Sequence, residues 1–148
     1  MTQDFNLAEI ILETADRYPQ RTAFRLPDGE LSYAQFKQML YSHAQRMREL
    51  GVDRDARVCI AVASPASQAC IALACSLLGC SFVSGTKSAL GNKTIGVTHT
   101  VRAGGDAAGA GKVSSIDRSW LPRQTIGAMD FPGFASPESI CFIAQSSG

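Results

Sequence analysis

The spacing of apolar side chains predicts two helices and a hairpin in the first fifty residues. Over 7–18 the apolar positions recur every three or four residues, as on one face of a helix: Leu7, Ile10, Ile11, Ala15 and Tyr18. The turn-forming run 27–29 separates two short strand-like runs, which predicts a β-hairpin. A capping box of Ser32 and Gln35 marks the start of a second predicted helix, over 33–50.

The next segment has the pattern of a strand, a helix and a second strand. Residues 57–63 form a near-continuous apolar run, which is typical of a strand buried on both faces of a parallel sheet. Ser64 and Pro65 suit the N-cap and first turn of a helix over 66–78, and 80–83 reads as the next strand. This order predicts a parallel βαβ unit, so the predicted fold class is α/β.

The pattern changes between 85 and 118. This stretch has no aromatic residue, holds more than half of the glycines, and carries apolar residues only singly. It predicts a poorly structured glycine-rich loop with one weak strand near 95–101, because little apolar surface offsets the entropy of ordering it. The stretch does not match a Walker phosphate loop, since Asp106 replaces a required glycine and Val113 replaces a required hydroxyl.

Structure is predicted to resume at Trp120, and a short buried strand is predicted over 139–144. That strand runs into Ser146, Ser147 and Gly148. Small hydroxyl residues and glycine directly after a strand can expose the N–H and O–H donors that bind phosphate. Taken alone, these residues fit a polar C-terminal tail better than a phosphate-binding loop.

Composition narrows the functional classes. The 148 residues carry a net charge of +1, which gives no reason to expect a nucleic-acid or membrane partner. No secretory signal or spanning run is present, so a cytoplasmic location is expected. No residue forms a convincing catalytic nucleophile, and His43 is expected to be a partly buried or surface histidine. Without a C-x-x-C pair, no metal or redox site is predicted, and the cysteines are expected to be reduced packing residues: Cys59, Cys70, Cys75, Cys80 and Cys141.

Several segments match one known family in order and spacing over 5–84: residues 15–24, 28–36, 50–52, 55–62 and 78–83. Together they resemble the start of the adenylate-forming superfamily, which includes acyl- and aryl-CoA synthetases, luciferases and the adenylation domains of peptide synthetases. The tail 140–148 is similar to the strand that leads into the Ser/Thr/Gly-rich loop of that family. The resemblance implies the N-terminal subdomain of an AMP-dependent synthetase/ligase, with fatty acid metabolism as the expected process.

The resemblance also implies a reaction. The parent enzyme would use ATP and Mg²⁺ to convert a small-molecule carboxylate into an acyl-adenylate, and coenzyme A would then form a thioester. Ser146, Ser147 and Gly148 would correspond to the first positions of the loop that holds the β- and γ-phosphates. The ribose-binding acid, the hinge and the C-terminal lysine of the family find no counterpart in the chain. It is therefore expected to bind no cofactor and to be inactive alone, as a truncated ligase.

The resemblance divides the chain into three parts. Residues 1–84 form the N-terminal α/β part, 85–118 a glycine-rich loop or divergent segment, and 119–148 a linker and strand that lead to a truncated phosphate loop. After Val83 the family usually continues with Pro-Leu, and an insertion, a frameshift or a degenerate copy could explain the difference. Two alternatives to the ligase fragment stay open. One is a non-catalytic module that binds a partner, as a homo-oligomer or with a complementing chain, and the other is a truncated product without function.

Overall fold

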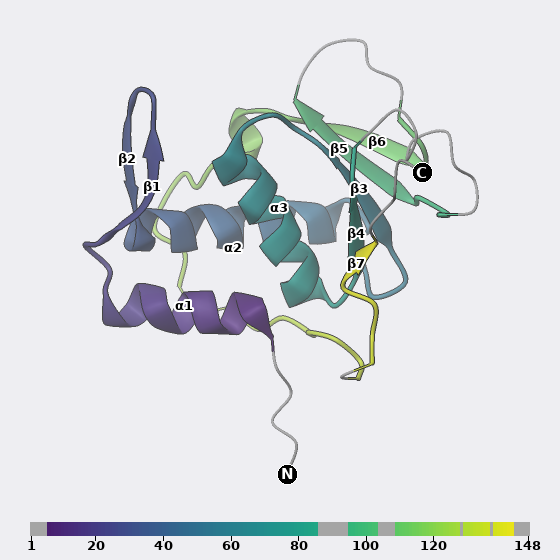
Figure 1. Ribbon diagram of the computed structural model, residues 1–148, viewed down its shortest axis with the longest axis horizontal. Coiled ribbons are helices and arrows are strands. Elements are labelled where there is room, and N and C mark those ends of the chain that lie inside the picture. Colours follow the sequence, from purple (N-terminus) through teal and green to yellow (C-terminus); the bar gives the residue numbers. More distant parts are fainter. Residues whose placement is uncertain (1–5, 86–94, 104–108, 128, 137, 144–148) are drawn as a thin grey trace, which may run out of the picture.

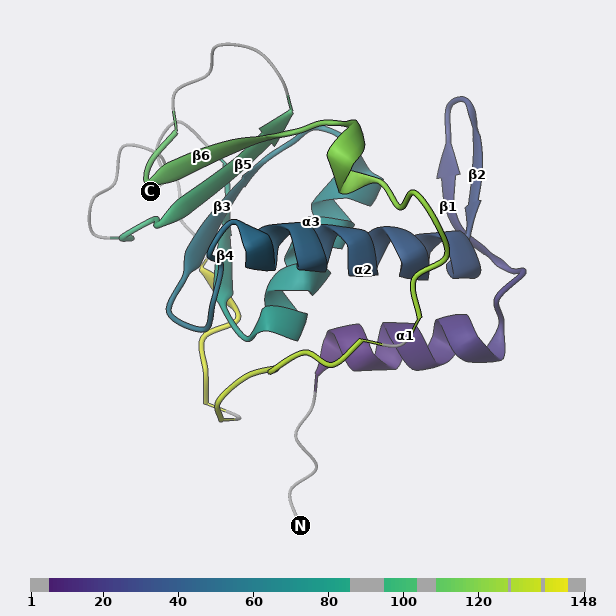
Figure 2. The same cartoon turned by 180° about the vertical axis from the view of Figure 1, so that it is seen from behind.

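The computed structural model describes residues 6–85, 95–103, 109–127, 129–136 and 138–143. A parallel sheet carries the helices on one face, and a small hairpin projects beside them (Figures 1 and 2). The predicted hairpin is confirmed, because β1 (Thr22–Leu26) and β2 (Gly29–Ser32) pair antiparallel. The predicted helices are also confirmed: α1 (Leu7–Arg17), α2 (Tyr33–Glu49) and α3 (Pro65–Leu78). No helix among the described residues is both long and apolar enough to cross a membrane.

All neighbouring strands of the main sheet run parallel. Within the described ranges its order is β6-β5-β3-β4-β7. The strands are β3 (Arg57–Ala61), β4 (Ser81–Ser84), β5 (His99–Ala103), β6 (Lys112–Ile116) and β7 (Phe142–Ile143). The predicted βαβ unit is β3–α3–β4, with Val58 opposite Phe82 and Cys59 opposite Val83. The carboxyl ends of the five strands therefore lie at the same edge of the sheet.

The structure differs from the sequence prediction in the glycine-rich stretch. Strands β5 and β6 lie between 85 and 118, where the sequence predicted a loop with one weak strand near 95–101. Strand β5 pairs with β3, buries Val101 against the helical core and Thr100 on the opposite face, and β6 then adds to its open edge. Backbone pairing with an existing strand needs few apolar side chains. The pattern of apolar residues in this stretch was therefore only a weak indication of strands.

Glycine is required at the turn into β6. Gly111 has a φ of +66°, and a Cβ placed there would lie 2.1 Å from the carbonyl oxygen of Thr98. The next amide, that of Lys112, donates a hydrogen bond of 2.9 Å to the same oxygen. The glycine at position 111 therefore reflects close backbone packing.

The two faces of the sheet are covered differently. On the helical face, the core combines apolar residues of α2 and α3 with Val58, Ile60 and Val101 of the sheet. On the opposite face, Cys59 and Val83 pack against Ile95 and its neighbours in the segment before β5. The central strand β3 is thus buried on both sides, as its continuous apolar run predicts.

The apolar stripe predicted for α1 is partly wrong. Leu7, Ile10 and Tyr18 are 53%, 40% and 42% exposed, whereas Ala8 and Ala15 are buried. The alanines lie on the face of α1 that meets the other helices, because their short side chains allow close approach. The larger side chains are consequently turned partly to the surface.

A segment that we call the strap, residues 121–127 and 129–135, crosses the helical layer between the 3₁₀ turn η1 (Arg118–Trp120) and β7 (Figure 2). Side chains of α2 and of the turn between α2 and β3 bind its backbone. The amide of Gln38 forms hydrogen bonds of 2.6 and 3.0 Å with the backbone of Ile126. Arg48 donates to the Asp130 carbonyl and Arg54 to the carbonyls of Pro132 and Gly133, and the Gly133 amide donates to the Leu77 carbonyl.

The Trp120 side chain anchors the start of the strap. It is 1% exposed and meets the ring of His43 edge-on, with 5.5 Å between the ring centroids. The hydroxyl of Ser42 donates a hydrogen bond of 2.7 Å to the Trp120 carbonyl. The indole therefore fixes the segment after β6 onto α2.

Replacing Trp120 with alanine should strongly destabilise the fold. We expect the free energy of unfolding to fall by about 3–5 kcal/mol, because the substitution leaves a large cavity over α2. Urea unfolding monitored by circular dichroism measures the change. Leu121→Ala is the control, since Leu121 is 47% exposed and its truncation should cost less than about 0.5 kcal/mol. Equal losses in the two variants would contradict the anchoring role.

His43 is more deeply buried than the sequence indicated, at 1% exposed. Its Nδ1 donates a hydrogen bond of 2.8 Å to the Met39 carbonyl, so the neutral tautomer carries its proton there. Its Nε2 is buried without a hydrogen-bond partner among the described residues. Burial lowers the pKa of His43 from its ordinary value of 6.5, although the Met39 carbonyl partly opposes the shift.

The stability of the protein should therefore decrease in acid. Below a pH of about 6.5 the unfolded chain binds a proton at His43 more readily than the folded chain does, so the free energy of unfolding falls as pH falls. His43→Asn removes this titration and keeps an amide donor near the position of Nδ1 for the Met39 carbonyl. We expect the variant to lose less stability than the parent protein between pH 7.5 and 5.0 in urea unfolding. The same pH dependence in both proteins would contradict the assignment.

Candidate functional site

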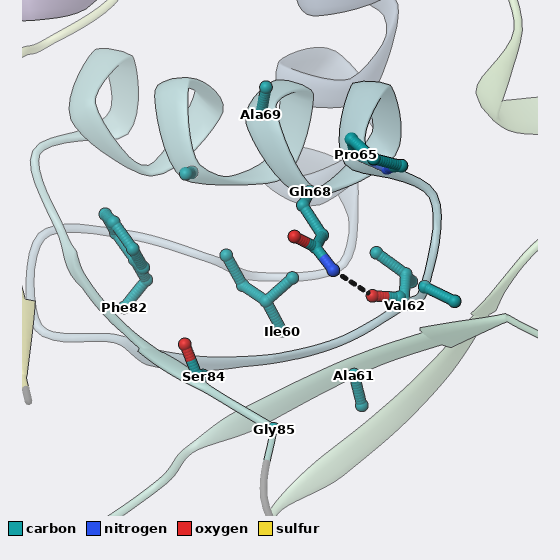
Figure 3. A pocket seen from close by; sticks show the side chains of 11 residues that line it. Ile60, Ala61, Val62, Pro65, Gln68, Ala69, Phe82, Ser84 and Gly85 are labelled. Carbon is teal, nitrogen blue, oxygen red and sulfur yellow. Dashed lines mark hydrogen bonds between the residues drawn. The ribbon is translucent and has the colours of Figure 1, made fainter. Parts of the chain in front are cut away.

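The carboxyl ends of β3 and β4 border a groove of about 680 Å³ beside α3 (Figure 3). In open parallel sheets, ligands bind at this edge of the strands. The groove is therefore the described surface of the chain where a ligand site is expected. Its lining comes from β3, the turn after it, α3 and β4: Ile60, Ala61, Val62, Ala63, Pro65, Gln68, Ala69, Ala72, Phe82, Ser84 and Gly85.

A short turn between β3 and α3 shapes one wall of the groove. Ser64 is the N-cap of α3 and Pro65 is its first residue, as the sequence predicts. The side chain of Gln68 reaches back, and its Nε2 donates a hydrogen bond of 2.7 Å to the Val62 carbonyl (Figure 3). This bond ties the first turn of α3 to the end of β3, so the turn is fixed from both sides.

Gly85 forms the other wall, directly after β4. Its amide donates a hydrogen bond of 2.7 Å to the Ile60 carbonyl, which brings the two backbones close together. A Cβ at position 85 would lie 2.6 Å from that oxygen and 2.7 Å from the Cα of Ala61. Only glycine fits this approach without a shift of the backbone.

The chemistry of the lining is neutral. Gln68 and Ser84 are its polar side chains, and none of the described lining residues is an acid, a base or a cysteine. Such a surface can hold an apolar or uncharged part of a ligand, but it offers no group for general acid–base catalysis. Nor do the described parts of the chain contain a group of His, Cys, Asp and Glu residues suited to a metal ion.

The predicted phosphate-binding residues Ser146, Ser147 and Gly148 lie outside the described residues. The structure does describe the strand that precedes them. Within the part of the chain that the structure describes, this strand, β7, covers Phe142–Ile143 and begins later than the predicted 139–144. It pairs in parallel with β4, so its carboxyl end points to the same edge of the sheet as the groove.

Phe82 connects this strand to the groove. Its ring lines the groove and lies 5.1 Å, centroid to centroid, from the ring of Phe142 on β7. Its amide donates a hydrogen bond of 3.0 Å to the Cys141 carbonyl.

The sequence analysis did not predict this groove. The helix-start signal at Ser64 and the glycine at 85, each directly after a predicted strand, were the available indications.

Two comparisons that use the sequence alone give no match. No protein-family model matches it, and no curated protein does. Comparison of the fold with solved structures, in contrast, gives clear matches to adenylate-forming enzymes.

Three of these structures illustrate the match. The N-terminal subdomain of NpsA from Klebsiella oxytoca has a TM-score of 0.80 and 18% identity, over 97% of this chain and 39% of that one. IdnL1 has a TM-score of 0.73 and 26% identity, over 95% of this chain and 31% of IdnL1. O-succinylbenzoate coenzyme A synthetase (MenE) from Bacillus subtilis, in complex with AMP, has a TM-score of 0.74 and 16% identity, over 93% and 38%.

These matches confirm the resemblance and the fold class predicted from the sequence. The chain has the mixed α/β fold found in the N-terminal subdomain of adenylation enzymes. It spans between 31% and 39% of the length of the three matched chains.

Gly85→Ala tests whether the close approach at the groove is required. We expect it to lower the free energy of unfolding by about 1–3 kcal/mol, because the added Cβ clashes with the Ile60 carbonyl. Gly127→Ala is the matched control, since a Cβ there meets nothing within 4 Å. Urea unfolding of both variants measures the difference, and equal unfolding midpoints would show that the wall of the groove adapts.

Proposed function

We propose that the chain is the N-terminal part of an ATP-dependent enzyme that activates a carboxylate as an acyl-adenylate. The observation that carries this proposal is the fold match over nearly the whole chain to enzymes solved with related ligands. MenE was solved with AMP, and the NpsA N-terminal subdomain was solved with 3-hydroxybenzoyl-AMSN. The matched fold thus belongs to enzymes whose ligands are AMP or acylated analogues of it.

Within this enzyme, Ser146, Ser147 and Gly148 would make the first contacts with the ATP phosphates. The position of β7 supports this role, because a loop after a parallel strand at the carboxyl edge can direct backbone amides toward an anion. Hydroxyl groups at 146 and 147 would add further donors. The neutral groove beside β7 would then border an uncharged part of the bound molecule.

The chain would provide a scaffold rather than the complete catalytic machinery. Transfer of a nucleotidyl group requires positive charge around the phosphates, from Mg²⁺ and basic side chains. The described lining of the groove supplies none. We therefore propose that adenylation, and subsequent thioester formation with coenzyme A, require the remainder of an adenylate-forming enzyme in addition to these residues.

The matched enzymes indicate which carboxylic acids to test first as substrates. Their names refer to aromatic acids, such as 3-hydroxybenzoyl and 3-hydroxyanthranilyl groups in NpsA and benzoate in a CoA ligase from Burkholderia xenovorans. Aromatic carboxylates are therefore the first substrates to test, together with the fatty acids that the sequence resemblance suggested.

A non-catalytic module that binds another polypeptide is the second candidate function. An apolar groove of about 350 Å³ favours it, because α1, the hairpin, α2 and α3 leave this surface uncovered. Leu7, Phe24 and Leu73 are among its lining residues. Association with another chain is common to both candidates, whereas only the first also predicts contact with ATP.

The purified chain should fail to catalyse acid-dependent pyrophosphate release. Mg-ATP is supplied with benzoate, 3-hydroxybenzoate or a fatty acid, and released pyrophosphate is measured by a coupled assay. The chain should gain ATP–pyrophosphate exchange when it is co-expressed with IdnL1 from which the region aligned to this chain has been removed. Ser147→Ala should reduce that exchange about tenfold, through loss of a phosphate contact.

Ser136→Ala is the matched control for Ser147→Ala. Ser136 lies in the loop before β7, and among the described residues its hydroxyl forms a hydrogen bond with that of Ser139. Exchange in this variant should match the parent complex. Acid-dependent pyrophosphate release by the chain alone would contradict the scaffold role, and a complex that forms without exchange would favour the non-catalytic module.

A further inference from the structure

Two thiols meet at the C-terminal end of α3. The helix ends at Gly79, whose φ is +78°, and the Cys80 amide donates a hydrogen bond of 3.0 Å to the Cys75 carbonyl. With the bond of 3.3 Å from the Gly79 amide to the Ser76 carbonyl, this is a Schellman motif. The motif places the residues before and after the turn side by side, and the thiols of Cys75 and Cys80 are close enough to interact electrostatically.

A third thiol reaches the same corner from a distant part of the chain. The Sγ of Cys141 lies 3.9 Å from the hydroxyl oxygen of Ser76, 65 positions earlier in the sequence. The pairing of β7 with β4 holds Cys141 there, because its carbonyl accepts the hydrogen bond from Phe82. Cys75 also interacts electrostatically with both Cys80 and Cys141, so the three thiols form one cluster, which we call the thiol corner.

The members of the thiol corner differ in exposure. Cys75 and Cys80 are fully buried, whereas Cys141 is exposed and lines a surface groove of about 430 Å³. Oxidants in solution can therefore reach Cys141 directly, whereas the thiols of Cys75 and Cys80 are shielded from them. Cys59 and Cys70 are buried elsewhere in the core.

Burial also controls which thiol reacts. The thiolate is the reactive form, and burial raises the pKa of Cys75 well above its ordinary value, with smaller contributions from Cys80 and Cys141. Burial likewise raises the pKa of Cys70, to about 12, and that of Cys59. An oxidant should consequently attack the exposed member of the corner first.

We propose that the thiol corner is a peroxide-sensitive site in which Cys141 is oxidised and Cys75 then forms a disulfide with it. In the first step the Cys141 sulfur attacks hydrogen peroxide, breaks the O–O bond, and becomes a sulfenic acid with release of water. In the second step the Cys75 sulfur attacks the sulfenic sulfur and displaces a second water. The two thiols lose two electrons in total, and the peroxide accepts them.

The disulfide would join two elements that are otherwise connected weakly. Strand β7 pairs with β4 through two residues, Phe142 and Ile143, and Cys141 is the residue before them. A covalent bond to the last turn of α3 would fix the position of this edge strand. The inference does not depend on the proposed enzymatic function, because it rests on the thiols alone.

Peroxide titration followed by mass spectrometry tests the site. The protein is treated with hydrogen peroxide, free thiols are alkylated with N-ethylmaleimide, and peptides are mapped. The parent protein should lose two of its five free thiols and yield a Cys75–Cys141 peptide pair, and dithiothreitol should reverse both changes. Cys141→Ser should lose thiols at least about tenfold more slowly, because the remaining four are buried.

Two further variants separate the steps. Cys75→Ala should stop at the sulfenic acid, which dimedone labels at Cys141, whereas Cys70→Ser should still form the disulfide. Retention of all five thiols in the parent protein would overturn the proposal. So would a disulfide that omits Cys141, or equally fast thiol loss in Cys141→Ser.

Discussion

The burial of β3 is the constraint on which the rest of the structure depends. This strand has a partner on each edge, β4 and β5, and apolar cover on each face. Its side chains alternate between the two cores, with Val58 and Ile60 toward the helices and Cys59 toward the opposite side. Both edges must be occupied because unpaired amides in the centre of a sheet are costly.

The requirement at β3 explains why the glycine-rich stretch is ordered where the structure describes it. The Arg57 carbonyl accepts a hydrogen bond from the Thr98 amide, and β5 continues the pairing from there. The pairing partner of β5 is set by a strand about 40 residues away, and no local pattern can report it. In contrast, α2 and α3 were predictable from the sequence, because their caps at Ser32 and Ser64 act locally.

The candidate site was predictable only in part for a related reason. The location of a parallel sheet, and hence of its carboxyl edge, follows from the βαβ pattern around α3. The groove itself depends on two long-range features, the return of Gly85 to the Ile60 carbonyl and the placement of Phe142 against Phe82. The apolar stripe of α1 was predicted only in part for the same reason. The buried face of this helix depends on its close approach to the other helices, which Ala8 and Ala15 allow.

The strap is attached in a way that affects how its sequence can change. Arginine and glutamine side chains of α2 and of the turn before β3 bind its peptide groups, and the Leu77 carbonyl accepts a hydrogen bond from the Gly133 amide. Any residue other than proline offers the same carbonyl and amide groups, so many substitutions in the strap would keep these bonds. Substitutions should therefore be tolerated in the strap more readily than at Gln38, Arg48 and Arg54. Relatives of this chain can then share the backbone path of the strap without sharing its sequence.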